Sequence, residues 1–224
     1  MGKRLSELLQ RAGYIIKTDG IIGLVRRSYT YFSPMIFDYG QLYLYQTHLK
    51  EWEEVNFKSK LGNVACKIIK SNQEADSLKG EYEDFRDIFM NASDYLNRGG
   101  IAVCLYSDRE FASISWLAIT QAARDCADSL PYRVDFSHGK ACTGGTFTVP
   151  KFRGNNLMTY SNYKKFRYLK ELGKTSVLNA IRTDNVASQK VYSKFGALMY
   201  ARATYIRIFG FKYWREIPSE LESL

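Results

Sequence analysis

The last third of the chain alternates between apolar strand-like runs and longer helical patterns, and this order constrains the fold most. Strand patterns at 141–149, 176–181 and 198–209 are separated by helical patterns at 154–172 and 185–195. Strands that alternate with helices in this way build α/β layers, because each helix covers the sheet between two strands. We therefore expect an α/β domain with a mixed sheet.

The middle of the chain adds further strands and helices to this pattern. Leu78, Tyr82, Phe85 and Phe89 recur at i, i+4, i+7 and i+11, which predicts one helix from Glu74 to Met90. The apolar runs on either side of residues 107–110 predict an antiparallel hairpin. The remaining elements that we expect are a strand at 64–69, a short helix at 92–98 and a helix at 121–130.

The N-terminal segment differs in character from the rest, so we predict an N-terminal helical and aromatic appendage at 1–60 and one domain at 61–224. Residues 1–35 hold six basic and two acidic side chains, a charge of +4, with leucines at helical spacing. Such a segment can lie on an anionic membrane surface, or pack as a helical pair on the main domain or on a partner subunit. Peripheral membrane contact and a homodimer therefore both stay open.

The chain shows no sign of membrane insertion or export. No run of eighteen apolar residues is present, and the first twenty residues lack the apolar core and small-residue cleavage site of a signal peptide. Four cysteines without paired spacing fit a reducing compartment, and two distant histidines give no metal cluster. We expect a cytoplasmic protein, with membrane-peripheral contact left open, and no metal.

The net charge of +9 is concentrated in one stretch. Residues 151–174 hold seven basic side chains and one acidic, whereas residues 74–94 hold seven acidic and two basic. A basic chain suits nucleic acid, but no zinc-finger spacing, RNA-binding strand motif or basic heptad is present. We therefore predict an anionic small ligand and no nucleic-acid partner.

The start of the helical pattern after residue 154 is suited to an anion. The first N–H groups of a helix have no intrahelical partner, and the helix dipole adds positive charge there. Lys151 and Arg153 precede this helix, and Gly154 allows close approach of a ligand to the backbone. In the next helical pattern, Asn185, Ser188 and Tyr192 share one side. An ordinary strand-to-helix turn remains the alternative for the first of these features.

Together these two stretches resemble the GNAT superfamily of acyl-CoA-dependent N-acyltransferases. Val149-Pro150 followed by Arg153-Gly154 is similar to its CoA pyrophosphate loop, and residues 185–197 are similar to its second signature, Asn-x-x-Ser/Ala-x-x-x-Tyr-x-x-x-Gly-Phe. The chain departs from the pattern with Asn156 and Met158 at two small positions, and with Ala197 in place of Phe. The resemblance covers roughly residues 61–209. It implies a single GNAT-like domain with a mixed, mostly antiparallel central sheet flanked by helices.

The resemblance also implies a co-substrate and its contacts. The co-substrate is acetyl-CoA or another acyl-CoA, and Tyr192 is the acid that protonates the leaving sulfur. The backbone edge of 145–149 holds the pantetheine arm, the amides of 153–159 hold the pyrophosphate, and Asn185 holds the pantetheine or its loop. The residues expected to bind the co-substrate are Phe147, Thr148, Val149, Arg153, Gly154, Asn155, Asn156, Leu157, Met158, Thr159, Asn185 and Ser188.

The implied reaction is transfer of an acyl group, and in particular of acetyl, from acyl-CoA to a primary amine of a small molecule such as an amino sugar or amino acid. Two alternatives stay open. One is a protein or peptide acyltransferase, and the other is a catalytically weak GNAT-like scaffold or membrane-associated module. Three residues, Glu110, Asp135 and His138, are candidates for the general base, and the sequence does not choose among them.

Overall fold

The computed structural model describes residues 13, 20–22, 37–89, 91–127 and 130–223. The chain divides into two compact units. The larger unit comprises Leu42–Arg202 and Ile217–Leu224, and the smaller comprises Met1–Gln41 and Ala203–Glu216. Apart from residues 13 and 20–22, which are helical, the helices expected within residues 1–35 lie outside the described residues.

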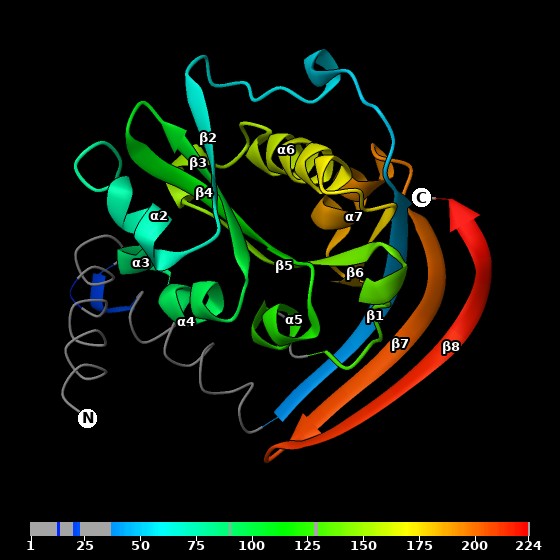
Figure 1. Ribbon diagram of the computed structural model, residues 1–224. Coiled ribbons are helices and arrows are strands. Elements are labelled where there is room, and N and C mark those ends of the chain that lie inside the picture. Colours follow the sequence, from blue (N-terminus) through cyan, green and yellow to red (C-terminus); the bar gives the residue numbers. More distant parts are fainter. Residues whose placement is uncertain (1–12, 14–19, 23–36, 90, 128–129, 224) are drawn as a thin grey trace. The chain divides into compact units, whose positions relative to one another are not determined.

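Eight strands of the described chain form one sheet in the order β2-β3-β4-β5-β6-β1-β7-β8 (Figure 1). Neighbouring strands from β2 to β5 are antiparallel, β5 and β6 are parallel, and β6 and β1 are antiparallel. The mixed, mostly antiparallel sheet that the sequence predicts is therefore confirmed. The strands are β1 (Phe37–His48), β2 (Val64–Ile69), β3 (Ile101–Ser107), β4 (Glu110–Ala118), β5 (Lys140–Thr148), β6 (Ser176–Arg182), β7 (Leu198–Ile208) and β8 (Phe211–Ser223).

Helices cover both faces of the sheet in the larger unit (Figure 1). The long helix α6 (Leu157–Glu171) and α7 (Val186–Ser193) pack on one face, in a core that includes Leu117, Phe166 and Val177. The second core lies on the other face around Phe85, Trp116 and Ile114. The helices there are α2 (Asn72–Ser77), α3 (Phe85–Ile88) and α4 (Ala92–Asn97), with α5 (Gln121–Ala127) next to α4.

Strand β1 is an integral part of the sheet, although the sequence places it in the appendage. It pairs with β6 from Leu42 opposite Arg182 to His48 opposite Ser176. The segment that follows brings Trp52 and Phe57 against the ring of Phe195, with centroid distances of 5.5 and 4.6 Å. The boundary expected after residue 60 is therefore not where the structure divides, because residues 42–60 belong to the larger unit.

The single helix expected from Glu74 to Met90 is wrong. Helix α2 starts at the Ser71 N-cap and ends at Ser77, and the chain then turns through Gly80, which has a φ of 88°. A new helix, α3, starts where the Asp84 side chain accepts a hydrogen bond from the Arg86 N–H. The apolar stripe still packs on the core, because the turn keeps Leu78, Tyr82, Phe85 and Phe89 on the side of the sheet.

The smaller unit contains the end of β7 and the start of β8. The turn between these strands contains Phe209 and Gly210, both with positive φ (46° and 88°). The Tyr205 ring lies edge-on to Trp214 at 6.2 Å, and Arg207 lies 3.8 Å from the Asp38 carboxylate. The candidate site described below lies wholly in the larger unit.

Candidate functional site

Strands β5 and β6 pair only at one end and then separate. The parallel ladder joins Lys140 to Ser176, Ala141 to Val177 and Cys142 to Leu178, and goes no further. From Thr143 onward β5 pairs with β4 alone. The opening between the two strands, which we call the fork, leaves one edge of β5 from residue 144 to 148 available to a ligand backbone or amide.

An extra residue distorts β5 at the fork. Ser115 of β4 lies opposite Thr146, whereas Leu117 lies opposite Thr143, so two steps on β4 correspond to three on β5. The extra residue falls at Gly144-Gly145, where β6 has already left. A bulge of this kind leaves a backbone group unpaired and aims it away from the neighbouring strand. The bulge therefore can present a backbone N–H to a carbonyl oxygen held in the fork.

The start of α6 follows from the end of β5 through a tight loop. Gly154 and Asn156 both have positive φ, 81° and 61°. Asn is one of the few residues that tolerates the left-handed region, so it can replace the small residue of the GNAT pattern here. Its side-chain Nδ2 donates to the Lys58 carbonyl oxygen at 2.9 Å, and the Lys60 N–H donates to the Asn155 carbonyl oxygen at 3.0 Å. The segment after β1 thus holds the loop in place.

The two cations expected at this loop lie differently. Arg153 is exposed, and its Nε donates to the Thr148 carbonyl oxygen at 3.3 Å, which keeps the guanidinium beside the end of β5. Lys151 instead forms an ion pair with Glu110 at the start of β4. Arg153 is therefore held at the end of β5, and Lys151 reaches an anion at the start of α6 only by leaving Glu110.

Tyr192 lies at the point where the strands separate. It is 4% exposed, and its hydroxyl is 3.0 Å from Thr143 Oγ1, at the first position of β5 beyond the β6 ladder. Burial raises the pKa of Tyr192 to about 12, although the hydroxyl of Thr143 and the amide of Asn162 lower it in part. The phenol keeps its proton at neutral pH, so it can donate a hydrogen bond into the fork.

Helix α7 places the other two residues of its polar side near α6. Asn185 caps the helix, since its Oδ1 accepts the Ser188 N–H at 3.1 Å. The Ser188 hydroxyl lies 4.0 Å from the Met158 sulfur, so the Met158 side chain extends toward α7 and packs on the helix-side core. Contact of Asn185 or Ser188 with pantetheine stays a prediction.

The three candidate bases lie away from the fork. Asp135 and His138 form an exposed pair, with 2.6 Å between a carboxylate oxygen and Nδ1, just before the paired end of β5. Glu110 is engaged with Lys151 at the opposite end of the strand. No base among these three is therefore positioned beside Tyr192.

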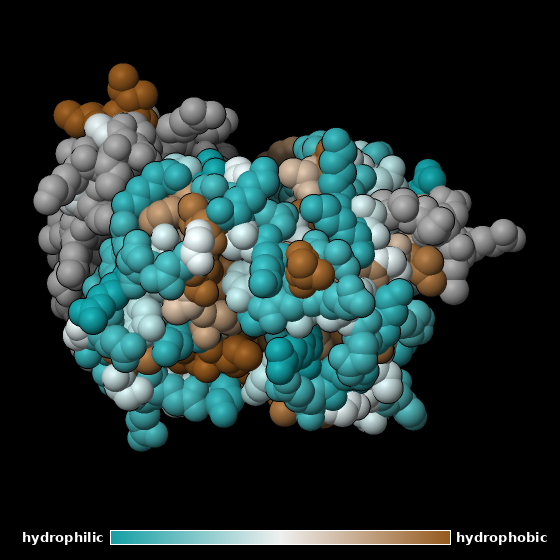
Figure 2. All heavy atoms as spheres, turned by 90° about the horizontal axis from the view of Figure 1, so that it is seen from above, coloured by the Kyte–Doolittle hydropathy of each residue, from teal (hydrophilic) through white to brown (hydrophobic). Residues whose placement is uncertain are grey.

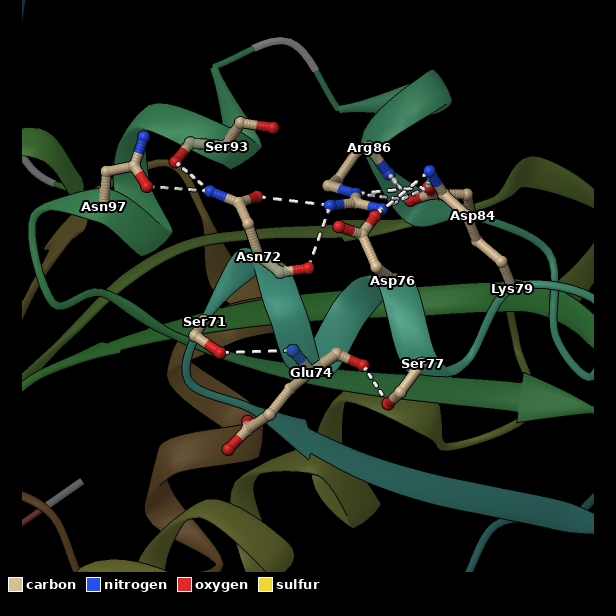
Figure 3. A network of polar contacts seen from close by, with 10 residues as sticks. All are labelled: Ser71, Asn72, Glu74, Asp76, Ser77, Lys79, Asp84, Arg86, Ser93 and Asn97. Carbon is tan, nitrogen blue, oxygen red and sulfur yellow. Dashed lines mark hydrogen bonds and ion pairs between the residues drawn. The ribbon is translucent and has the colours of Figure 1, made fainter.

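The helices on the other face carry most of the acidic stretch, and several of its charges are paired (Figure 3). Arg86 bonds Asp84 through Nε at 2.9 Å and through a terminal nitrogen at 2.7 Å, and it also reaches Asp76 at 2.7 Å. Its other terminal nitrogen donates to the side-chain oxygen of Asn72. The side-chain nitrogen of Asn72 in turn donates to Asn97 Oδ1 of α4 at 2.9 Å. This network ties α2, α3 and α4 together, so it accounts for these carboxylates as structural groups.

The sequence does not single out several polar residues at the fork. Thr143, Asn162, Lys165 and Asn179 are all buried, and they come from three different elements, β5, α6 and β6. Each of them lies within an apolar pattern, and only the packing of α6 on the strands brings them together. The one sequence signal for such a residue is a polar side chain at a position where the helix or strand pattern predicts an apolar one.

Three further features bear on partners. None of the described helices has the length and apolar character needed to cross a bilayer. Across the described ranges, no three His, Cys, Asp or Glu side chains gather as a metal site. The face in Figure 2 is largely hydrophilic, with apolar residues showing in small groups between polar ones.

Comparison with known proteins gives a fold but no close relative. No family model matches the sequence. No curated protein matches it either. Among solved structures, a tandem GNAT protein from the clavulanic acid biosynthesis pathway aligns with a TM-score of 0.52 and 14% identity, over 82% of this chain and 55% of that one.

Two other solved structures are similar at lower scores. A putative GNAT-family acetyltransferase from Novosphingobium aromaticivorans gives a TM-score of 0.48 and 14% identity, over 75% of this chain and 63% of that one. A glucosamine N-acetyltransferase region of a fungal multi-domain β-N-acetylglucosaminidase gives 0.49 and 10%, over 86% of this chain and 23% of that one. This chain thus spans less than two thirds of the length of these three structures. The tandem GNAT protein, at a TM-score of 0.52, shows that this chain has a GNAT-like fold.

Proposed function

We propose that this protein transfers an acyl group from an acyl-CoA thioester to a primary amine of a small molecule, such as an amino sugar or amino acid. The observation that carries the proposal is the fork, with Tyr192 at the point where β5 and β6 separate. The hydroxyl of Tyr192 lies 3.0 Å from Thr143, where β6 leaves β5. The open edge of β5 suits the amides of a pantetheine arm, and the start of α6 suits its pyrophosphate.

The residues of the fork would act on the thioester in a definite order. The amine attacks the carbonyl carbon, and an N–H of the Gly144-Gly145 bulge stabilises the oxygen that becomes negative. The carbon–sulfur bond then breaks, and CoA leaves as a thiolate. Because the pKa of Tyr192 is about 12, its hydroxyl favours hydrogen-bond donation to the thiolate over complete proton transfer. The excess proton of the amine leaves through water.

Thiol release from acetyl-CoA, measured over a panel of amines, tests the proposal. Tyr192→Phe keeps the ring and removes only the hydroxyl that donates to the developing thiolate, so turnover should fall by about a hundredfold to a thousandfold while CoA affinity hardly moves. Tyr168→Phe is the matched control, since Tyr168 is a tyrosine of α6 that packs against the same core.

Three outcomes would count against this account. Full turnover of Tyr192→Phe would remove its hydroxyl from the reaction. Loss of CoA binding in the same variant would make the residue structural. A wild-type protein that binds CoA but releases no thiol with any amine would favour the scaffold alternative, and transfer only to peptides would favour the protein acyltransferase.

A further inference from the structure

The face of α6 that packs on the sheet is unusually polar. Ser161, Asn162 and Lys165 lie on it with exposed fractions of 1%, 1% and 0%. A helix face that is buried against a sheet is normally apolar, because an unpaired polar group loses its bonds to water there. No hydrogen-bond partner for Lys165 Nζ is found among the described residues. This amine is therefore a buried group that packing alone does not account for.

The contacts along α6 place Lys165 beside the fork. Near the start of the helix, Leu157 packs with Ala112 of β4, and the Ser161 hydroxyl then lies 2.6 Å from that of Ser115. Helix and strand thus run in the same direction. One turn of helix beyond Ser161 advances about 6 Å, and two residues of strand beyond Ser115 advance about 7 Å. Lys165 therefore lies over Leu117, the residue paired with Thr143.

A second unpaired polar side chain lies on the other side of the fork. Asn179 of β6 is 3% exposed, and neither of its amide atoms has a hydrogen-bond partner in the part of the chain that is described. It follows Leu178, the last residue that pairs with β5, and alternation along the strand puts it on the face of Val177 and Ile181, which pack in the helix-side core. Lys165 and Asn179 thus flank the fork on the same face of the sheet.

An unpaired buried amine and carboxamide destabilise a fold unless a ligand supplies hydrogen-bond or ion-pair partners for them. Burial alone lowers the pKa of Lys165 to about 7, so the amine is largely neutral above that pH and can take up a proton when an anion arrives. A plain acetyl methyl group offers these side chains no bond. An acyl chain that ends in a carboxylate can form an ion pair with Lys165 and accept a hydrogen bond from the side-chain nitrogen of Asn179.

We infer that the acyl group carries a terminal carboxylate, of the malonyl or succinyl class, which Lys165 and Asn179 bind at the fork. This inference rests on the proposed function and names the acyl donor that the function leaves open. Lys165 is on this account a specificity-determining residue, because it contacts the far end of the acyl group and not the reacting carbon.

Calorimetric titration with CoA, acetyl-CoA, malonyl-CoA and succinyl-CoA tests the inference. We expect malonyl- or succinyl-CoA to bind at least about tenfold more tightly than acetyl-CoA, which corresponds to about 1.4 kcal/mol. Binding at pH 8 should take up close to one proton, detected by repeating the titration in buffers of different ionisation enthalpy. Lys165→Met should abolish both the preference and the proton uptake.

Lys164→Met is the matched control, because Lys164 is the adjacent residue of α6 and pairs with Glu54 away from the fork. It should keep the preference. Equal affinity for all the thioesters, or a preference that survives in Lys165→Met, would overturn the inference and leave the proposed function standing. Absence of binding by every CoA compound would instead overturn the proposed function, and the inference with it.

Discussion

Lys165 is fully buried and the side chain of Arg86 is 12% exposed, and these two cations lie on opposite faces of the same sheet in surroundings that differ in kind. Arg86 is held by two carboxylates and an amide that lie within hydrogen-bond distance (Figure 3). Lys165 has no such partner among the described residues. The difference teaches that the cation that holds helices together is paired, whereas the cation beside the fork, in the part of the chain that the structure describes, is not. Unpaired buried polar groups lower the stability of the fold, and such groups are typical of binding sites.

The comparison predicts that removing the unpaired cation stabilises the protein. Between pH 7 and pH 10.5 the unfolded chain binds a proton on Lys165 that the folded chain does not, so the free energy of unfolding should rise with pH across this window. At about 1.4 kcal/mol per pKa unit the full effect is about 5 kcal/mol. Lys165→Met should therefore be more stable than wild type by up to this amount at pH 7 and no more stable near pH 10.5.

Chemical denaturation of both proteins at several pH values measures this difference. Other groups that titrate in the same range cancel in the comparison of the two curves. A constant difference between wild type and Lys165→Met from pH 7 to pH 10.5 would show that Lys165 is charged and solvated in the folded protein.

Removing a partner of the paired cation should have the opposite sign. Burial alone would raise the pKa of Asp84, but its bonds with Arg86 hold the pKa below its usual value. Asp84→Ala removes this pairing and also the N-cap of α3, so we expect a loss of about 2–3 kcal/mol in the free energy of unfolding. Asp94→Ala, at an exposed carboxylate in α4, should change it by less than about 0.5 kcal/mol. Equal effects of the two substitutions would mean that the network does not stabilise the helices.

The smallest expected effect compares two asparagines. Asn179→Leu removes two unpaired buried atoms and should stabilise the protein by about 1–2 kcal/mol, because an apolar side chain of similar volume is cheaper to bury. Asn72→Leu removes bonds to Arg86 and Asn97 and should destabilise it by about 1 kcal/mol. Thermal unfolding followed by circular dichroism measures both, and a loss of stability in Asn179→Leu would contradict the contrast between the two regions.

Local patterns in the sequence predict much of the sheet and its two long helices. The strands at 64–69 and 176–181, and the helix that Gly196 terminates, depend on periodicity and on turn residues close by. The position of β1 between β6 and β7 depends on contacts distant in sequence, so no local pattern could place it. Periodicity does not reveal the break between α2 and α3, because the apolar stripe continues through it. The positive φ of Gly80 and the N-cap at Asp84 produce the break.

The site shows the same division between local and distant information. The loop before α6 and the spacing from Asn185 to Tyr192 are visible in the sequence, and the left-handed conformation of Asn156 agrees with what Asn tolerates. The fork is not visible, because it arises where pairing between β5 and β6 stops. Only that arrangement brings Lys165 and Asn179 to the same site.

The central claim is that a CoA thioester lies in the fork, and hydrogen–deuterium exchange with and without acetyl-CoA tests it most directly. At about 1 mM ligand, well above a Kd in the micromolar range (about −8 kcal/mol), the site is filled. The account predicts slower exchange at the amides of 144–148 and 157–159, with no change in α2, α3 and α4. Unchanged exchange in both segments, or protection confined to the other face of the sheet, would contradict it.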